Sequence, residues 1–169
     1  QLTALVANAG VTGPKSRVDE LTVERVERIL AVNVLGTIVC CREAVQRFST
    51  LHGGSGGSIV LMGSAASRIG GSGEYVDYAA SKGAIDTFTI GLAKEVGAEG
   101  IRVNAVWPGV IRTEIHITSG DPERVGRIGR SAPLERPGEP EEIARAIVWL
   151  ASDQASYVTG ALLDIAGGR

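Results

Sequence analysis

The sequence contains few of the residues that form disulfides and metal centres. Its 169 residues include two cysteines, Cys40 and Cys41, which are adjacent in a segment with a helical pattern. Neighbouring positions of a helix point in different directions, so we expect no disulfide between them. The two histidines, His52 and His116, are far apart in the sequence and lack the spacing of metal ligands. We therefore expect neither a disulfide-stabilised fold nor a metal site.

Excess charge and long apolar segments are also missing. A formal net charge of −2 gives no electrostatic reason to expect nucleic acid or an anionic membrane as a partner. Uninterrupted apolar runs, such as 59–62, are far too short for a helix that spans a membrane. The sequence does not open with a charged segment followed by an apolar stretch, so it shows no signal peptide. These absences favour a cytoplasmic protein that binds neither nucleic acid nor membrane.

What the sequence does contain is an alternation of short apolar runs and helical patterns. The runs are typical of strands covered on both faces, and they lie at about 3–7, 58–62, 102–106 and 162–165. Helices are expected after Thr22 as N-cap, at about 35–48 and 77–96, after Asp121 with Pro122 at the first position, and from Glu141. The order βαβαβαβ predicts an α/β fold with a parallel sheet and right-handed crossovers, in one domain over 1–169.

The segment from Tyr78 to Lys82 places a phenol and an ammonium one helical turn apart, on the same face of the helix. A lysine cation beside a phenol lowers the phenol pKa from its ordinary value of about 10. Tyr78 could then donate or accept a proton near neutral pH. Taken alone, such a pair is more often two neighbours on a helix surface, so the interpretation depends on what surrounds it.

Four further elements occur in order around this pair. Asn8-Ala9-Gly10 follows the first strand-like run, Asn33 lies in the first helical region, Ser64 follows the second run, and Pro108-Gly109 follows the third. This ordered set resembles the short-chain dehydrogenase/reductase family, over essentially the whole chain. The resemblance implies the C-terminal part of a Rossmann-like, doubly wound parallel sheet. It also implies an NAD- or NADP-dependent oxidoreductase that interconverts a small-molecule alcohol and a carbonyl by hydride transfer.

One departure from the family concerns its glycine-rich turn, T-G-x-x-x-G-x-G, which receives the cofactor pyrophosphate at a helix N-terminus. This chain begins in what resembles the family's fourth strand. The glycine-rich stretch 53–57 precedes a strand and opens no helix, and 70–73 is expected to be a loop between Ser64 and Tyr78. We therefore expect the four strands to form one contiguous half of the family's sheet, with 3–7 at an exposed edge. By itself the chain is not expected to bind NAD(P) productively.

The resemblance assigns a role to each residue of the central set. Tyr78 is the catalytic acid or base, and Lys82 lowers its pKa and hydrogen-bonds the nicotinamide ribose. Ser64 holds the substrate oxygen as a donor where negative charge develops. Asn33 positions a water in a proton relay to Lys82. The alternatives are a packed tyrosine, a surface lysine, a turn serine and an asparagine that kinks a helix.

The resemblance also implies a cofactor-binding set and a substrate lid. Asn8, Ala9 and Gly10 would meet the adenosine side of the cofactor. The loop after the third strand would wrap the nicotinamide through Pro108, Gly109, Ile111 and Thr113. The polar segment 114–130, His116 included, would be a mobile lid that shapes specificity. The choice between NAD and NADP cannot be read from these residues.

Two nearby residues compete for these roles. Ser67 is the second candidate for the serine, although Ser64 directly follows the strand and is therefore better positioned. Tyr75 is the second tyrosine, but the residue four positions later is Ala79, which supplies no cation. Tyr75 is expected to line the substrate pocket or to pack.

Two other functions stay open beside the oxidoreductase. The chain could be a non-catalytic fragment that folds or oligomerises without binding cofactor. The epimerase and dehydratase branch shares the Tyr78–Lys82 pattern, but it has a larger C-terminal substrate domain than a chain ending at Arg169 provides. The resemblance further implies a homo-oligomer, and a tetramer in particular, formed through the helices at 35–48 and 77–96.

Overall fold

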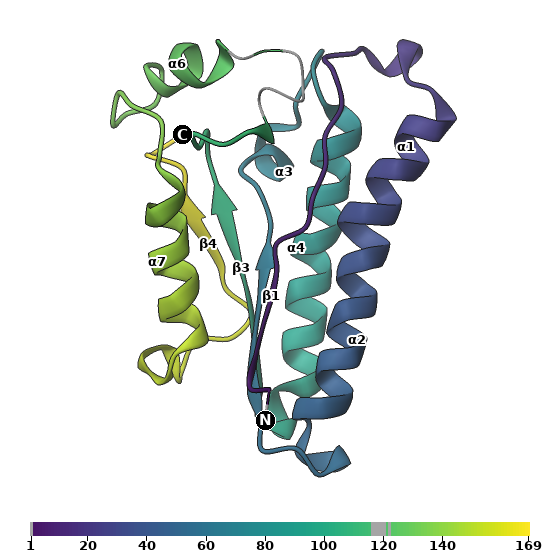
Figure 1. Ribbon diagram of the computed structural model, residues 1–169, viewed down its shortest axis with the longest axis vertical. Helices are drawn as coiled ribbons and strands as arrows, with labels where there is room; N and C mark the ends of the chain where they lie inside the picture. The colour runs from purple at the N-terminus through teal and green to yellow at the C-terminus, as the bar shows by residue number, and fades with distance from the viewer. Residues whose placement is uncertain (1, 116–120, 122) are drawn as a thin grey trace.

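A single four-stranded parallel sheet organises the fold. The computed structural model describes residues 2–115, 121 and 123–169. The strands are adjacent in chain order, β1-β2-β3-β4, and all neighbours are parallel (Figure 1). Their bounds are β1 Ala4–Ala7, β2 Gly57–Met62, β3 Ile101–Pro108 and β4 Leu162–Ile165. The predicted α/β class and the contiguous half-sheet are thereby confirmed.

The helices differ from the predicted ones mainly in the first half of the chain. The α-helices are α1 Val23–Leu30, α2 Thr37–Phe48, α3 Ala66–Ile69, α4 Val76–Val96, α6 Arg124–Gly129 and α7 Pro140–Ala151. Short 3-10 turns are η1 Val18–Glu20, η3 Thr50–His52, η4 Gly97–Glu99 and η5 Asp153–Ala155. Thr22 caps α1 as predicted, because its hydroxyl accepts a hydrogen bond from Arg25 N at 3.2 Å. The predicted N1 proline, Pro122, lies outside the described residues.

The first two helices are joined into one rod. The π-helical segment η2, Ala31–Gly36, continues α1 directly into α2, so the separate helix predicted from residue 35 was wrong. Within the described residues, this rod from Val23 to Phe48 is the helix long and apolar enough to span a membrane by length and composition alone. Core helices pass the same test, and Cys41, Ala44 and Phe48 of this rod pack in the core.

Helices cover the two faces of the sheet unequally. The rod and α4 lie on one face, and α7 lies on the other (Figure 1). Because side chains alternate along a strand, Ile59 and Leu61 pack under α2 and α4, while Val60 packs against Ile143 and Leu150 of α7. Among the described residues, no helix covers the second face of the edge strand β1, where Val6 is 43% exposed.

The third crossover differs in hand from the other two. Each connection leads to the next strand in the same direction across the sheet, but α7 passes over the face opposite to α2 and α4. Crossovers on opposite faces that advance in the same direction have opposite hands, so the prediction of uniformly right-handed crossovers was wrong. The connection to α7 is long and passes over the strand ends through α6. It supplies the apolar helix face that Val60 and Val106 require.

Candidate active site

Tyr78 and Lys82 lie on the first turns of α4, beside the carboxyl ends of β1 and β2. The start of this helix is fixed by Asp77, whose Oδ1 accepts a hydrogen bond from Tyr78 N at 2.9 Å. Arg25 of α1 donates from Nε to Asp77 Oδ2 at 2.7 Å, and only 3% of the Asp77 side chain is exposed. This buried ion pair joins α1 to the helix turn that carries Tyr78.

The Lys82 ammonium is buried at the centre of the site. The residue is 2% exposed, and its Nζ donates a hydrogen bond to the carbonyl oxygen of Met62, at the end of β2, at 2.7 Å. Nζ also lies 5.6 Å from the centroid of the Tyr78 ring. Burial lowers the pKa of Lys82 to about 8, and the carboxylate of Asp86 opposes this effect. Lys82 can therefore exchange a proton close to physiological pH.

Tyr78 is paired with Ser64. Burial raises the pKa of the Tyr78 phenol above its ordinary value, and a hydrogen bond with the Ser64 side chain acts in the opposite direction. The expected lowering of this pKa by Lys82 does not occur in this structure. The physical reason is that the ammonium is directed to the Met62 carbonyl and meets the ring of Tyr78 rather than its oxygen.

The two candidate serines face different partners. Ser64 lies beside Tyr78, and its Oγ accepts a hydrogen bond from Ala66 N at 3.1 Å. Ser67 donates from Oγ to the Ser64 carbonyl oxygen at 2.9 Å. The geometry therefore favours Ser64 over Ser67 as the serine that acts with Tyr78.

Asn33 is held by the structure around it. It is buried in the π-helical segment, where its Nδ2 donates to the carbonyl oxygen of Val11 at 2.9 Å and to Ser81 Oγ at 3.0 Å. Its Oδ1 accepts from Val11 N at 2.8 Å. The side chain thus braces the loop after β1 against α4. The water relay to Lys82 stays a prediction.

The loop of Asn8, Ala9 and Gly10 is exposed at the carboxyl end of β1. A Cβ added at Gly10 would stand 3.5 Å from Lys82 Nζ and 3.6 Å from Asn33 Oδ1. The backbone of this loop therefore lies beside the catalytic candidates. A cavity of about 720 Å³ opens here, lined by Gly10, Val11, Thr12, Gly13, Pro14, Glu24, Arg25, Arg28, Ile29, Glu114 and Ile115.

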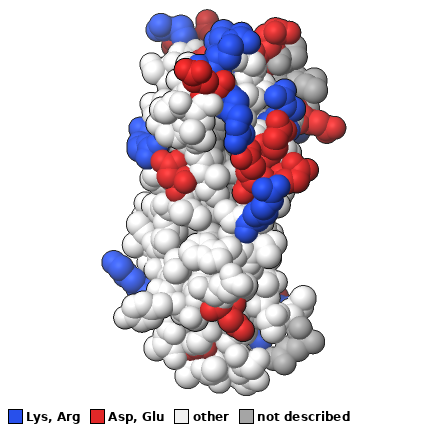
Figure 2. All heavy atoms as spheres, turned by 90° about the vertical axis from the view of Figure 1, so that its left-hand side faces the viewer, with Lys and Arg blue, Asp and Glu red and all other residues white. Residues whose placement is uncertain are grey.

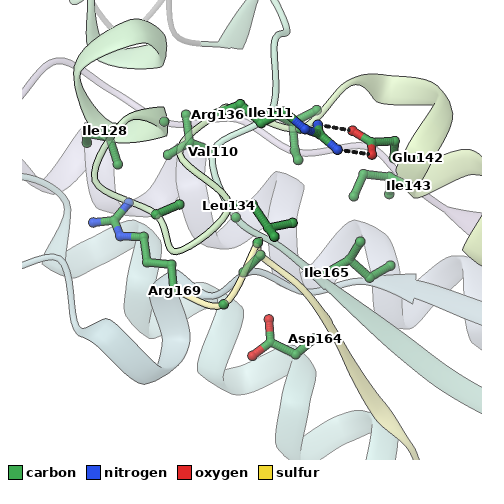
Figure 3. Close-up of a pocket in the computed structure, with 17 residues that line it drawn as sticks. Val110, Ile111, Ile128, Leu134, Arg136, Glu142, Ile143, Asp164, Ile165 and Arg169 are labelled. Atoms are coloured by element: carbon green, nitrogen blue, oxygen red, sulfur yellow. Dashed lines mark hydrogen bonds and ion pairs between the residues drawn. The ribbon is translucent and has the colours of Figure 1, made fainter.

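The predicted nicotinamide loop contacts the core more than expected. A Cβ at Gly109 would come within 2.7 Å of Ala166 Cα, so only glycine allows this loop to pack on the end of β4. Ile111 is buried among apolar residues under α7, whereas Thr113 is exposed. The Ile111 side chain faces a second cavity of about 360 Å³, on the α7 side (Figure 3). Any contact of Ile111 with a cofactor must therefore use its backbone.

Ion pairs that sequence reasoning missed connect the lid region to the site. Lys15, in the loop after Gly10, pairs with Asp121 at 2.7 Å and with Glu74 at 3.3 Å. Arg124 of α6 pairs with Glu74, and its guanidinium lies 4.8 Å from the centroid of the Tyr75 ring. Tyr75 is buried as predicted for a packed residue, and its hydroxyl has no hydrogen-bond partner among the described residues. His116 lies outside the described residues.

Charge gathers near the carboxyl ends of the strands on the α7 side as well. Figure 2 shows acidic and basic side chains at this end of the face and a largely uncharged surface at the other. Arg136 and Glu142 form a bidentate pair there, at 2.8 and 2.7 Å, beside the second cavity (Figure 3). Among the described residues, no group of three or more His, Cys, Asp or Glu side chains could hold a metal ion. The absence of a metal site stays a prediction.

Comparison with known proteins gives consistent matches over the chain. The family model described as enoyl-(acyl carrier protein) reductase matches residues 1–169. The sequence is 58% identical to the uncharacterized oxidoreductase YgfF of Escherichia coli (strain K12), over 99% of this chain and 68% of that protein. It is 40% identical to glucose 1-dehydrogenase of Gluconobacter oxydans (strain 621H), over 99% of this chain and 62% of that protein.

A third relative and a solved structure extend this list. The 3beta-hydroxysteroid dehydrogenase 1 of Eggerthella lenta is 40% identical over 96% of this chain and 61% of that protein. The solved structure of ElxO with NADP bound superposes with a TM-score of 0.89 at 30% identity, over 99% of this chain and 67% of that one. The chain therefore spans between 61% and 68% of the length of these four proteins.

Proposed function

The chain belongs to the short-chain dehydrogenase/reductase family, and we propose that its Tyr78 site serves an NAD(P)-dependent oxidoreductase that interconverts an alcohol and a carbonyl. The observation that carries this proposal is the grouping of three side chains at the strand ends. The Ser64 side chain lies near enough to the Tyr78 phenol to lower its pKa, and the buried Lys82 Nζ lies 5.6 Å from the centroid of the Tyr78 ring.

The described residues fit the nicotinamide ribose of such a cofactor. Lys82 is a buried donor beside the exposed backbone of Gly10, and ribose hydroxyls accept hydrogen bonds from an ammonium. Asn8 and Ala9 extend the same exposed loop toward the adenosine side. When bound, the cofactor supplies or accepts the hydride. The relatives named as dehydrogenases and ElxO with NADP bound support NAD or NADP in this role.

The residues of this chain would manage the proton and the substrate oxygen. In carbonyl reduction Tyr78 gives its proton to the substrate oxygen, and in alcohol oxidation it takes that proton back. Ser64 donates a hydrogen bond to the same oxygen as negative charge develops on it. Lys82, with a pKa of about 8, passes a proton to or from the tyrosine side of the site. The cavity beside Gly10 would admit the substrate.

A second candidate function is a non-catalytic fragment that oligomerises without cofactor. The exposed second face of β1 and its unpaired edge favour it, because an unprotected edge invites pairing with another chain. The oxidoreductase is the better supported proposal, because a non-catalytic role leaves the burial of the Lys82 ammonium beside Tyr78 unexplained.

Assembly and location follow from the same proposal. Exposed apolar side chains along the rod and α4 support a homo-oligomer; they are Leu30, Leu35, Ile38, Val39 and Ile90. A tetramer and a cytoplasmic location complete the proposal. Light scattering of the full-length protein tests this assembly, and a monodisperse monomer would contradict it.

The function is tested by hydride transfer in the full-length protein. Reduction of NAD and NADP is followed with aldoses and hydroxysteroids, and oxidation of NADH and NADPH with ketosteroids, because relatives carry glucose and hydroxysteroid dehydrogenase names. Tyr78→Phe should lower turnover by about 10²–10⁴, since only the proton-transfer group is removed. Tyr157→Phe is the matched control, because Tyr157 is fully exposed and should leave turnover unchanged. Equal turnover of the two variants would refute the role of Tyr78.

A further inference from the structure

A buried carboxylate lies directly behind the candidate active site. Asp86 follows Lys82 by one helical turn on α4 and is only 9% exposed. Its Oδ1 accepts a hydrogen bond from Trp107 Nε1 of β3 at 2.6 Å. Burial of an ionised carboxylate is costly unless charge and hydrogen bonds compensate it. The neighbours of Asp86 therefore need to be accounted for.

Among the described residues, few charged side chains lie near Asp86. Lys82 interacts electrostatically with it, one turn earlier on the same helix face. The Arg68 guanidinium of α3 lies on the Trp107 ring, 5.5 Å from its centroid, but it pairs with Asp164 of β4 at 2.8 Å. Tyr78, on the far side of Lys82, is the other titratable group that faces the ammonium. Lys82 is thus the cation that compensates Asp86.

Lys82 and Ser67 both donate hydrogen bonds to one short backbone segment. Lys82 Nζ donates to the Met62 carbonyl oxygen at 2.7 Å, and Ser67 Oγ donates to the Ser64 carbonyl oxygen at 2.9 Å. This segment, 62–64, carries Ser64 toward Tyr78. The Trp107 indole, which hydrogen-bonds Asp86, packs on this same segment, because a Cβ added at Gly63 would come within 2.6 Å of Trp107 Cδ1.

We propose that Asp86 is a positioning residue of this site, whose negative charge keeps Lys82 in the ammonium form and whose hydrogen bond to Trp107 holds the indole against the segment that presents Ser64. This inference rests on the proposed function only where it concerns turnover. Asp86 is the group that raises the Lys82 pKa against burial, which otherwise lowers it. Without the carboxylate the Lys82 pKa would fall below about 8, and the ammonium would be lost at a lower pH.

The direct test is the titration of Lys82 in the full-length protein, followed by NMR with isotope-labelled lysine and assigned with Lys82→Arg. In Asp86→Asn the hydrogen-bonding shape is kept and the charge is removed, so the Lys82 titration should move down by about one pH unit. Trp107→Phe is the matched control, because it removes the indole donor and keeps the carboxylate. Identical Lys82 titrations in wild type and Asp86→Asn would overturn the proposal.

A measurement on the unmodified protein covers the case in which Asp86→Asn fails to fold. The carboxyl carbon of Asp86 should titrate below neutral pH, so that Asp86 is ionised where Lys82 is charged. An Asp86 that stays protonated above pH 8 would overturn the proposal. Turnover of the same variants is then measured against pH. Asp86→Asn should move the alkaline limb of the pH–rate profile for carbonyl reduction to lower pH. If the wild-type protein catalyses no hydride transfer, while Asp86→Asn still lowers the Lys82 titration, the proposed function is refuted and this inference stands.

Discussion

On the α4 side of the candidate site, buried groups hold one another through hydrogen bonds, whereas on the α6 side partly exposed side chains form ion pairs. Lys82 and Asn33 are almost fully buried, and both are tied to backbone atoms of neighbouring elements. Across the cavity, the Lys15 side chain is 37% exposed, and Asp121 joins it to Arg127. Buried, fully paired groups are rigid, while exposed ion pairs are screened by salt and contribute little.

This difference matches the demands of the proposed chemistry. Proton transfer requires its donor to be held in place, and the Asp77 and Met62 hydrogen bonds fix the helix turn that carries Tyr78 and Lys82. A lid must open to admit substrate, and contacts that are weak individually allow it to do so. The buried side should therefore respond strongly to single substitutions and the lid side weakly.

The largest effect is expected for the buried ion pair between Arg25 and Asp77. Arg25→Met would leave the Asp77 carboxylate buried with its cation removed, which should lower the free energy of unfolding by about 3–5 kcal/mol. Urea denaturation of the full-length protein measures this change. Arg17→Met is the matched control, because its pair with Asp19 is exposed on both sides. Equal losses in the two variants would contradict the contrast between buried and exposed pairs.

The next effect separates the two serines. Ser64→Ala should lower kcat/KM by roughly 10², about 3 kcal/mol, because an oxyanion donor is lost. Ser67→Ala should be mild, since the Ser67 hydroxyl donates to a backbone carbonyl rather than to Tyr78 or the substrate. Steady-state kinetics on both variants decides the matter. The reverse ranking would show that Ser67 is the serine that holds the substrate oxygen.

Features of this structure that depend on local sequence patterns could be predicted, whereas features that depend on packing between distant segments could not. Strands and the Tyr78–Lys82 turn follow from local patterns, and both are found where the pattern places them. The face covered by α7 could not be predicted, because strands with apolar residues on both faces fit helices on either side. The continuity of the rod through η2 also escaped prediction, since the segment from Ala31 to Gly36 contains Asn33 and Gly36, residue types that commonly end helices.

The polar contacts of the site were the least predictable part. Asp86 and Trp107 are 21 positions apart, and Arg25 and Asp77 are 52 apart, so no local spacing in the sequence predicts either pair. A signal existed only for Asp86, which follows Lys82 by four positions on a predicted helix. The lowering of the Tyr78 pKa was expected from that same spacing for Lys82. It did not occur, because the direction of an ammonium depends on acceptors such as the Met62 carbonyl, which the spacing does not reveal.

The smallest effect is expected on the lid side, at Lys15. Lys15→Met removes the cation shared by Asp121 and Glu74, and it should change KM by about two- to fivefold with kcat unaltered. The difference from wild type should shrink as salt rises, because these charges are exposed to screening.

The hydrogen bond from Lys15 is also the main cause that lowers the Asp121 pKa. A lowered carboxylate pKa stabilises the contact above the ordinary aspartate range, and the contact is lost as pH falls through the lowered value. The KM values of the two proteins should therefore converge as salt is raised. They should stay different from neutral pH down to pH 4, because Asp121 remains ionised over that range. A KM difference that persists undiminished in high salt would show that Lys15 contacts the substrate itself rather than holding the lid.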